Sequence, residues 1–526
     1  MRYDALLYGL GRLLLLTGMV LLIPGGMAWF EGGGDQTASV TFVGFAIAAG
    51  ISLLVGMGFQ FSFKAGRDKQ GVREGFAIVV IGWLLICALG AVPLTAWLME
   101  VKGYGVLRAF TDGYFETMSG LSTTGATILF DIEEVPRSLL FWRALTHWLG
   151  GMGIITLAIA IFPAMGVGGY QMFRGEVAGP SADRLRPRLA ESVKVLWIVY
   201  VFLTALMTVF LYFGGMDVFD SLCHAFATLA TGGFSTRNGS VAAYQSAYLE
   251  WVIIVFMFLA GINFLLHFRL ITQRDWKPVV RNQELRFYVV LVLGATVFFV
   301  LMLSGNGMED PAVSYRNFQP DMPTLAEHQA HVEQEAARFN TGESAIRHSL
   351  FQVLAIVTTT GFGTADFDVW PRSASLILVV LMFFGACAGS TSGGMKLIRI
   401  MVGWKAAWRE VKKVVRPHLL APVKVERHAV QEGLISNIMG FILLFFMLLG
   451  LASFLMTLFI PDLTTAVTSV IATLANIGPG LSGVGPMQSF GWIPIGGKWV
   501  LIVCMLLGRL EVFTVIVMLR KSFWKR

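Results

Sequence analysis

Four short polar phrases recur along this otherwise apolar chain, and each sets a glycine beside hydroxyl or amide side chains. Unpaired backbone carbonyls at membrane depth cost several kcal/mol unless they line a polar cavity or bind an ion. A ring of carbonyls can replace the hydration shell of a cation, and glycine suits such a ring because it tolerates positive φ. The phrases are LSTTGAT at 121–127, LATGGFS at 229–235, VTTTGFG at 357–363 and LANIGPG at 474–480. They predict one cation-binding ring containing Gly125, Gly232, Gly361 and Gly478.

A single TTG phrase would be weak support for a cation-binding ring, since TTG is common in turns and helix caps. Threonine hydroxyls near a membrane helix end also bond to backbone carbonyls, and both roles are open to Thr123, Thr359 and Thr360. Four copies at equivalent positions favour the ring.

The composition is that of a polytopic membrane protein. Of 526 residues, 56% are hydrophobic and 14% charged, whereas a globular domain has about 25% charged residues. A membrane-spanning helix needs about 20 apolar residues, and continuous apolar runs favour helices over barrel strands. Ten segments qualify: 5–30, 40–63, 76–98, 138–163, 192–214, 247–268, 286–304, 374–398, 432–460 and 497–519.

The chain has a net charge of +7, and its basic residues are expected to lie on one side of the membrane. This distribution argues against nucleic-acid binding. Lysine and arginine concentrate in alternate connections and at both termini, whereas the intervening connections are acidic. The positive-inside rule therefore predicts cytoplasmic termini. The four cysteines lie in membrane-type sequence without CxxC spacing, so neither a disulfide framework nor a zinc site is indicated.

Each phrase follows a short, mostly apolar stretch in an outward-facing connection. About 12 helical residues span about 18 Å, roughly half a bilayer, so these stretches can enter the membrane but not cross it. Helix-start residues Asp217, Ser344 and Asp462 precede three of them. The negative ends of the helix dipoles would then point at the membrane centre.

These features predict an all-α polytopic membrane protein. It would have two N-terminal helices followed by four helix–pore loop–helix repeats, giving ten full spans and four re-entrant half-helices. The expected units are a two-helix extension at 1–70 and repeats at 71–175, 176–283, 284–428 and 429–526.

The segment GACAGSTSGGMK, at 385–396, has a composition that cannot hold a regular membrane helix. We expect a loop beneath the ring, because unwound backbone at this depth must face protein or a water-filled cavity. A close-packed helix crossing is the alternative, and the spacing excludes a phosphate-binding GxxxxGK[ST] loop. Its candidate residues are Gly385, Gly389, Ser390, Thr391, Ser392, Gly393, Gly394 and Lys396.

Arg509 lies within the apolar run LIVCMLLGRLEVFTVIVML. An arginine there costs about 3 kcal/mol or more unless it faces water or a partner. In a cation pore its charge would raise the barrier to passage. The alternative is a structural pair with Glu511 or another buried acid, although residues two apart point to different helix faces.

Other polar residues in apolar surroundings carry weaker signals. Glu116 either raises the local cation concentration or bonds to the filter backbone, and we favour bonding. His147 and His224 stand alone, which favours core hydrogen bonds over metal binding. The stretch 305–345 is expected to include a short amphipathic helix that lengthens the third repeat.

Several longer phrases carry a family resemblance that covers essentially the whole chain. They are HWLGGMGII at 147–155, MGVGGYQMFRGEVAGP at 165–180, GINFLLHF at 261–268, ACAGSTSGGMK at 386–396 and GRLEVFT at 508–514. The chain resembles the TrkH membrane subunits of the Trk/Ktr and HKT superfamily of potassium transporters. The resemblance implies a potassium-channel-like pore, potassium uptake across the bacterial inner membrane, and gating by segment 385–396 and Arg509.

The resemblance also implies backbone ligands for K⁺ at the filter glycines and the two residues before each. These are Thr123, Thr124 and Gly125; Ala230, Thr231 and Gly232; Thr359, Thr360 and Gly361; Asn476, Ile477 and Gly478. In the family a serine at the first glycine position accompanies sodium permeation, so Gly125 favours potassium. The ANIGPG phrase departs from the threonine consensus, so the ring is expected to be uneven.

The resemblance further implies a homodimer in the lipid bilayer and a cytosolic TrkA-type nucleotide-binding subunit. K⁺ is the transported ligand and no covalent cofactor is expected. Two alternatives remain open: a sodium-permeable or ion-coupled transporter of the same superfamily and, more remotely, an intramembrane enzyme using Ser390 or Ser392 with His147.

Overall fold

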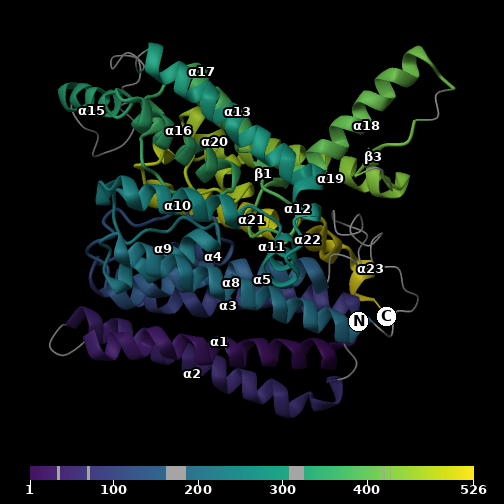
Figure 1. Cartoon of the computed structure of the whole chain (residues 1–526). Coiled ribbons are helices and arrows are strands. Elements are labelled where there is room, and N and C mark those ends of the chain that lie inside the picture. The colour runs from purple at the N-terminus through teal and green to yellow at the C-terminus, as the bar shows by residue number, and fades with distance from the viewer. Residues whose placement is uncertain are drawn as a thin grey trace.

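The computed structural model is almost entirely helical. It describes residues 1–31, 36–67, 71–160, 185–306, 308, 325–418, 421–426 and 428–525. Two long N-terminal helices, α1 (Tyr3–Glu31) and α2 (Gln36–Ser62), form an antiparallel pair beside α3 (Val72–Glu100) (Figure 1). Glycines allow the close approach of the pair, since a Cβ on Gly56 would lie 3.0 Å from the carbonyl oxygen of Gly11.

Four short helices occupy the predicted half-helix positions. They are α4 (Val106–Leu121), α9 (Val218–Leu229), α16 (Gly342–Val357) and α20 (Leu463–Leu474). Asp217 and Asp462 cap two of them by accepting backbone N–H groups, as predicted. The prediction of Ser344 as a cap is wrong, because Thr341 caps α16 and accepts from the Ser344 N–H.

The longer helices connect these half-helices. Within the described residues, six helices are long and apolar enough to cross a membrane, or eight if two bent helix pairs each count as one span. Besides α1, α2 and α3, the longer helices are α5 (Arg137–Ala160), α8 (Leu185–Phe213), α13 (Gln283–Asn306) and α19 (Glu432–Thr457).

Three of the ten predicted spans are interrupted. The span predicted at 247–268 consists of α10 (Ala247–Ala260) and α11 (Phe264–Gln273), with a 100° bend between them. The span predicted at 497–519 consists of α21 (Ile495–Arg509) and α22 (Val512–Leu519), with a 111° bend. Asn263 makes the first break possible, because its side chain caps the second helix by accepting the Leu265 N–H.

The third interrupted span is the one predicted at 374–398. Helix α17 (Arg372–Leu381) ends early, and a loop leads to α18 (Leu397–Val415), which projects from the body of the molecule in Figure 1. We call residues 385–396 the intramembrane loop. Strands β1 (Phe384–Gly385) and β2 (Met395–Lys396) pair in parallel at its two ends.

The remaining described elements are short. The helices are α12 (Lys277–Arg281), α15 (Leu325–Ala337) and α23 (Lys521–Trp524), with 3₁₀ turns η1 (Lys64–Gly66), η4 (Ser240–Tyr244), η5 (Phe367–Val369), η6 (Ser482–Val484) and η7 (Phe490–Trp492). The antiparallel pair β3 (Lys424–Val425) and β4 (His428–Ala429) follows α18.

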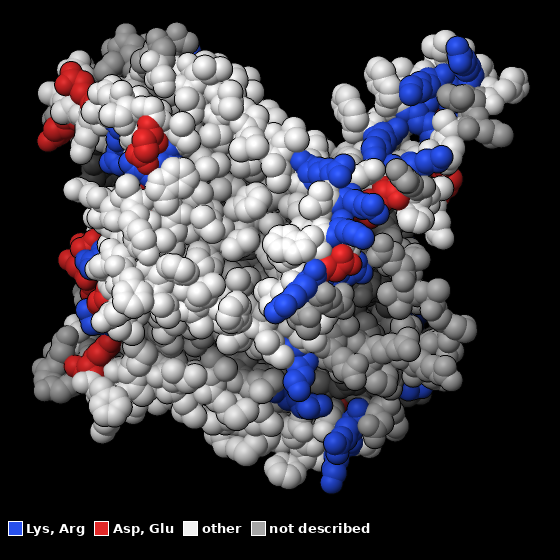
Figure 2. Space-filling model, in the orientation of Figure 1, with Lys and Arg blue, Asp and Glu red and all other residues white. Residues whose placement is uncertain are grey.

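Basic and acidic side chains concentrate at opposite ends of the molecule. On the face shown in Figure 2, lysine and arginine gather at the right and acidic residues lie mainly at the left, with an uncharged surface between. Both chain termini lie at the right in Figure 1, the basic end. The pattern matches the expected polarity of a multi-pass membrane protein.

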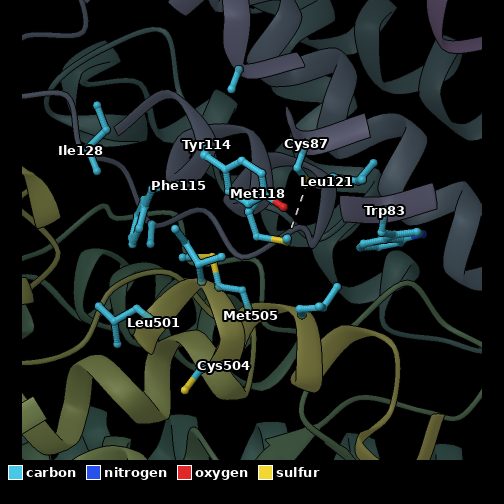
Figure 3. Close-up of a cluster of buried hydrophobic side chains, with 14 of the residues drawn as sticks. Trp83, Cys87, Tyr114, Phe115, Met118, Leu121, Ile128, Leu501, Cys504 and Met505 are labelled. Atoms are coloured by element: carbon cyan, nitrogen blue, oxygen red, sulfur yellow. Dashed lines mark hydrogen bonds between the residues drawn. The ribbon is translucent and has the colours of Figure 1, made fainter. Parts of the chain in front are cut away.

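The first half-helix is packed between elements far apart in sequence. Figure 3 shows Phe115 and Met118 of α4 between Cys87 of α3 and Leu501 and Met505 of α21. All five side chains are buried. The last long helix thus packs against the first half-helix, which brings the two ends of the repeated region together.

Candidate functional site

Each half-helix ends in the same unusual backbone turn. Two residues beyond the last helical residue, the chain adopts positive φ at a non-glycine residue: Thr123 (52°), Thr231 (54°), Thr359 (59°) and Asn476 (55°). Two residues further on, a glycine has positive φ: Gly125 (84°), Gly233 (82°), Gly361 (75°) and Gly478 (106°). Left-handed conformations at non-glycine residues are strained and cluster at functional sites.

This register corrects the alignment of the second phrase. Gly233, rather than Gly232, has the conformation of the other three glycines. The equivalent triplet is therefore Thr231, Gly232 and Gly233, and Ala230 lies one position too early. Two adjacent glycines make the sequence ambiguous here, whereas φ distinguishes them.

The four glycines lie against one another in a closed ring. A Cβ placed on Gly125 would lie 2.1 Å from the Gly232 carbonyl oxygen, and one on Gly233 would lie 1.9 Å from that of Thr360. The ring continues and closes in the same direction: a Cβ on Gly361 would lie 1.9 Å from the oxygen of Ile477, and one on Gly478 would lie 2.8 Å from that of Thr124. Each glycine thus faces the carbonyl preceding the next glycine.

A cavity of about 120 Å³ touches this ring, and its lining includes Gly125, Gly233, Gly361 and Gly478. No aspartate or glutamate is among its described lining residues. The oxygen atoms on this lining belong to backbone carbonyls, hydroxyls and the side-chain amides of Asn238 and Gln488, and Arg143 and Arg237 also line the cavity. At the ring itself the oxygens are backbone carbonyls, aided by the negative ends of the half-helix dipoles.

A polar side chain on each half-helix braces the segment that follows its own glycine. Glu116 accepts the Ile128 N–H (2.8 Å), and His224 Nε2 accepts the Ser235 hydroxyl (3.0 Å). Gln352 Nε2 donates to the Ala365 carbonyl (3.3 Å), and Thr468 Oγ1 donates to that of Leu481 (3.2 Å). Sequence reasoning missed Gln352 and Thr468, although Gln352 shares with Glu116 and His224 the position five residues before the helix end.

Two side chains of α5 join the segments that follow α4 and α9. Arg143 donates to Glu116 (2.7 Å) and to the Ser235 carbonyl (3.3 Å). His147 Nδ1 donates to the Gly120 carbonyl (2.7 Å), and its Nε2 accepts the Phe234 N–H (3.2 Å). The bonding role favoured for Glu116 and the hydrogen-bonding role of His147 are both confirmed.

The intramembrane loop lies directly against the C-terminal ends of three half-helices. Thr391 Oγ1 donates to the Leu229 carbonyl (2.9 Å), and the Gly393 N–H donates to Thr359 Oγ1 (2.7 Å). A Cβ on Gly393 would lie 2.5 Å from the Ala475 carbonyl. The loop is therefore in contact with the ends of α9, α16 and α20.

Lys396 holds the loop in its folded shape from within. Its ammonium donates to the Ser392 carbonyl (2.7 Å) and hydroxyl (3.0 Å) and to the Ser390 carbonyl and hydroxyl (both 3.3 Å). The predicted loop residues are therefore gathered in one place.

Arg509 lies beside the loop with no carboxylate partner among the described residues. Its side chain is 2% exposed, and Nη1 donates to the Thr391 carbonyl (2.8 Å), while Nε and Nη2 have no partner in the described part of the chain. The alternative pairing with Glu511 is wrong, because Glu511 pairs with Arg399 at 2.5 Å. The phrase at 165–180 lies outside the described residues.

The outer helix α15 docks onto the segment that follows Gly361. Arg338, just after its end, donates to the Thr364 carbonyl (2.7 Å), and the buried Glu335 accepts the Asp366 N–H (3.0 Å). His331 bonds to Asp366 at 3.0 Å, and this bond raises the pKa of His331. The predicted amphipathic helix therefore contacts the segment that follows α16.

The docking of α15 is expected to depend on pH. Because the pKa of His331 is raised, the His331–Asp366 bond stabilises the docked helix fully below about pH 6.5. This stabilisation is lost as pH rises through the raised pKa. Protease cleavage within 325–337 should therefore be faster at pH 8 than at pH 6. His331→Gln should abolish this difference, and an unchanged difference would contradict the assignment.

Comparisons with known protein families, sequences and structures all match the chain to TrkH proteins. The family model of TrkH cation transport proteins matches residues 43–526. The chain is 34% identical to the Trk system potassium uptake protein TrkH of Escherichia coli K12, with 100% of both chains covered, and 35% identical to that of Halomonas elongata, with 92% of each covered. The crystal structure of the potassium transporter TrkH from Vibrio parahaemolyticus matches with a TM-score of 0.82 and 31% identity over 100% of both chains. The chain belongs to the TrkH family of cation transport proteins.

Proposed function

We propose that this protein takes up K⁺ across the bacterial inner membrane through a pore whose filter is the ring of backbone carbonyls. The observation that carries the proposal is the closed contact of Gly125, Gly233, Gly361 and Gly478, each against the next segment. Four strands that meet on a common axis direct several carbonyls at one path, as dehydration of an alkali cation requires. The relatives of this chain are potassium uptake proteins, which supports K⁺ as the cargo.

The proposed ligands follow the register of the structure. They are the carbonyls of Thr123, Thr124, Gly125, Thr231, Gly232, Gly233, Thr359, Thr360, Gly361, Asn476, Ile477 and Gly478. Asn476 also donates from its side chain to Thr124 Oγ1 (2.9 Å) and to the Met505 carbonyl (3.1 Å). The fourth segment is therefore held by side-chain bonds that differ from those of the threonine phrases, which supports an uneven ring.

The intramembrane loop and Arg509 form the proposed gate. The loop contacts the inner ends of three half-helices, and Arg509 brings a buried positive charge to the same place. A cation leaving the ring would meet both. Opening then requires the loop to move away from Thr359 and Leu229.

The proposed setting places both termini, α18 and the β3–β4 hairpin in the cytoplasm, where basic residues concentrate (Figure 2). Helix α18 carries exposed Trp404 and Trp408 together with Lys412 and Lys413. Such a helix suits contact with anionic lipid headgroups. Its position also suits contact with a cytosolic TrkA-type regulatory subunit, and we retain a homodimer as the assembly.

The test is ion competition in proteoliposomes carrying wild-type protein or Gly125→Ser. A serine Cβ would be forced against the Gly232 carbonyl at a φ of 84°, so that carbonyl must move. We expect the preference for K⁺ over Na⁺ to fall about tenfold, equivalent to about 1.4 kcal/mol. An unchanged preference in a folded variant would contradict the filter assignment.

The second candidate is a sodium-permeable or ion-coupled transporter of the same superfamily. The departure of Asn476 and Ile477 from the threonine pattern favours weaker selection at one quarter of the ring. Flux measured with and without a sodium or pH gradient separates these mechanisms from simple K⁺ conduction. The intramembrane-enzyme alternative has little support, because both His147 nitrogens bond to backbone groups and Ser390 and Ser392 contact Lys396.

A further inference from the structure

A buried carboxylate, Glu284, fastens both ends of the intramembrane loop. Glu284 lies in the first turn of α13 and is 3% exposed. One of its oxygens, Oε1, accepts the N–H of Ala388 (2.8 Å) and the N–H of Ile398 (3.0 Å). Ala388 lies in the incoming part of the loop, and Ile398 lies in the first turn of the outgoing helix α18. A single atom therefore joins the two limbs.

Other bonds also join the two limbs, but none of them satisfies the Ala388 or Ile398 N–H. The β1–β2 pair holds Phe384 beside Met395 and Gly385 beside Lys396, and the Leu397 N–H donates to the Ala386 carbonyl at 3.3 Å. Within the loop, the Ala386 N–H donates to the Ser392 hydroxyl (3.1 Å) and Lys396 donates to Ser390. Without Glu284, the buried Ile398 N–H and the partly buried Ala388 N–H would lose their acceptor. Because unpaired buried donors are costly, the loop would then favour a conformation that exposes them.

Glu284 is connected in turn to the cytosolic side of the molecule. Glu426, in the turn between β3 and β4, accepts from Asn282 Nδ2 (2.9 Å) and from the Gln283 N–H (3.3 Å). Lys405 of α18 donates to the Gln283 side chain (3.4 Å) and to the Lys424 carbonyl (3.0 Å). The residues immediately before Glu284 are thus held by the hairpin and by α18.

We propose that Glu284 is a positioning residue that latches the intramembrane loop shut, and that displacement of the β3–β4 hairpin releases it. This inference rests on the proposed function, since it concerns the regulation of the same gate. Contact of a cytosolic protein with the hairpin would pull on 282–283 and so on the carboxylate. Loss of the two bonds would free the loop to leave Thr359 and Arg509.

The first experiment measures Rb⁺ uptake into proteoliposomes containing the full chain without any regulatory subunit. Glu284→Ala removes the acceptor and is expected to raise basal uptake about tenfold, with unchanged preference for K⁺ over Na⁺ because the ring is untouched. Glu284→Gln, which keeps a carbonyl oxygen but loses the charge, is expected to give an intermediate rise. Asp275→Ala serves as control, since Asp275 is an exposed acid whose carboxylate accepts the nearby Lys277 N–H (3.1 Å).

The second experiment uses the loop's own cysteine and does not depend on transport. Cys387 is buried beside Ala388, and the other cysteines, Cys87, Cys223 and Cys504, are replaced by alanine. Modification of Cys387 by a methanethiosulfonate reagent is expected to be about tenfold faster in Glu284→Ala than in the parent.

The two experiments separate the latch from the pore. Faster modification of Cys387 with no cation flux in any variant would retain the latch and overturn the proposed function. Unchanged modification and unchanged Rb⁺ uptake in a Glu284→Ala protein that elutes as a folded species on size exclusion would overturn the latch. Glu426→Ala removes the hairpin's bonds to Asn282 and Gln283 but leaves Glu284 in place. It is expected to accelerate the modification of Cys387 less than Glu284→Ala does.

Discussion

Replacing Gly361 by alanine is expected to reduce K⁺ uptake about a hundredfold or more. The new Cβ would lie 1.9 Å from the Ile477 carbonyl oxygen and 2.9 Å from Pro479, and φ at this position is 75°. Both the backbone turn and the adjacent strand must change, because the groups that block the Cβ belong largely to the backbone. Two or three carbonyls would leave the ring, and each contributes to replacing the hydration shell. Rb⁺ uptake into proteoliposomes measures the loss.

Gly363→Ala is the matched control, two residues away on the same segment. A Cβ there would meet only Pro486, at 3.9 Å, and Gly363 lacks positive φ. We expect uptake within about twofold of wild type, as for an ordinary surface-like substitution. Equal losses in the two variants would show that the glycine conformation at 361 has no special role, and the ring would then not be the filter.

Removing the charge of Arg509 is expected to have the opposite effect, a large rise in basal cation flux. Two unit charges about 8 Å apart at an effective dielectric constant of about 20 repel by about 2 kcal/mol, which corresponds to about thirtyfold in rate. Arg509→Ala also removes the bond to the Thr391 carbonyl and so loosens the loop. The measurement is Rb⁺ flux without a regulatory subunit.

Two comparisons sharpen the Arg509 result. Arg509→Lys keeps the charge but shortens the reach to Thr391, so a smaller rise is expected. The preference for K⁺ over Na⁺ should be unchanged in both variants, because the ring glycines do not contact Arg509. Wild-type flux in a folded Arg509→Ala protein would assign the residue a structural role alone.

The half-helices and their following turns could be predicted because their determinants are local. About twelve apolar residues, a capping acid such as Asp217 or Asp462, and a polar phrase with glycine fix a short helix that ends in a turn. The same local reasoning failed where two neighbours were equally suitable. Gly232 and Gly233 are both glycine, and Thr341 and Ser344 are both good caps, so the choice depended on which backbone geometry the neighbouring segments allowed.

The interruptions of the long helices were only partly predictable. Four glycines within 385–396 cannot sustain a membrane helix, and the loop was expected for that reason. The bend at 261–263 was missed because Gly261 and Asn263 lie inside an otherwise apolar run that satisfies the length criterion. Hydropathy records how apolar a segment is, but not whether its backbone bonds are satisfied elsewhere, as when the Gly261 carbonyl accepts the Cys387 N–H (3.0 Å).

Apolar length, glycine placement and motif spacing are properties of neighbouring residues, so the amino-acid sequence was enough to identify a multi-pass membrane protein of the TrkH family and to locate four short helices. Three contacts became visible only in the folded molecule. Gly478 meets the segment that follows α4, Glu511 pairs with Arg399, and Glu284 joins two limbs of a loop about a hundred positions away in the chain. Such contacts depend on how whole helices pack, and no spacing along the chain specifies which distant backbone group a buried side chain will reach.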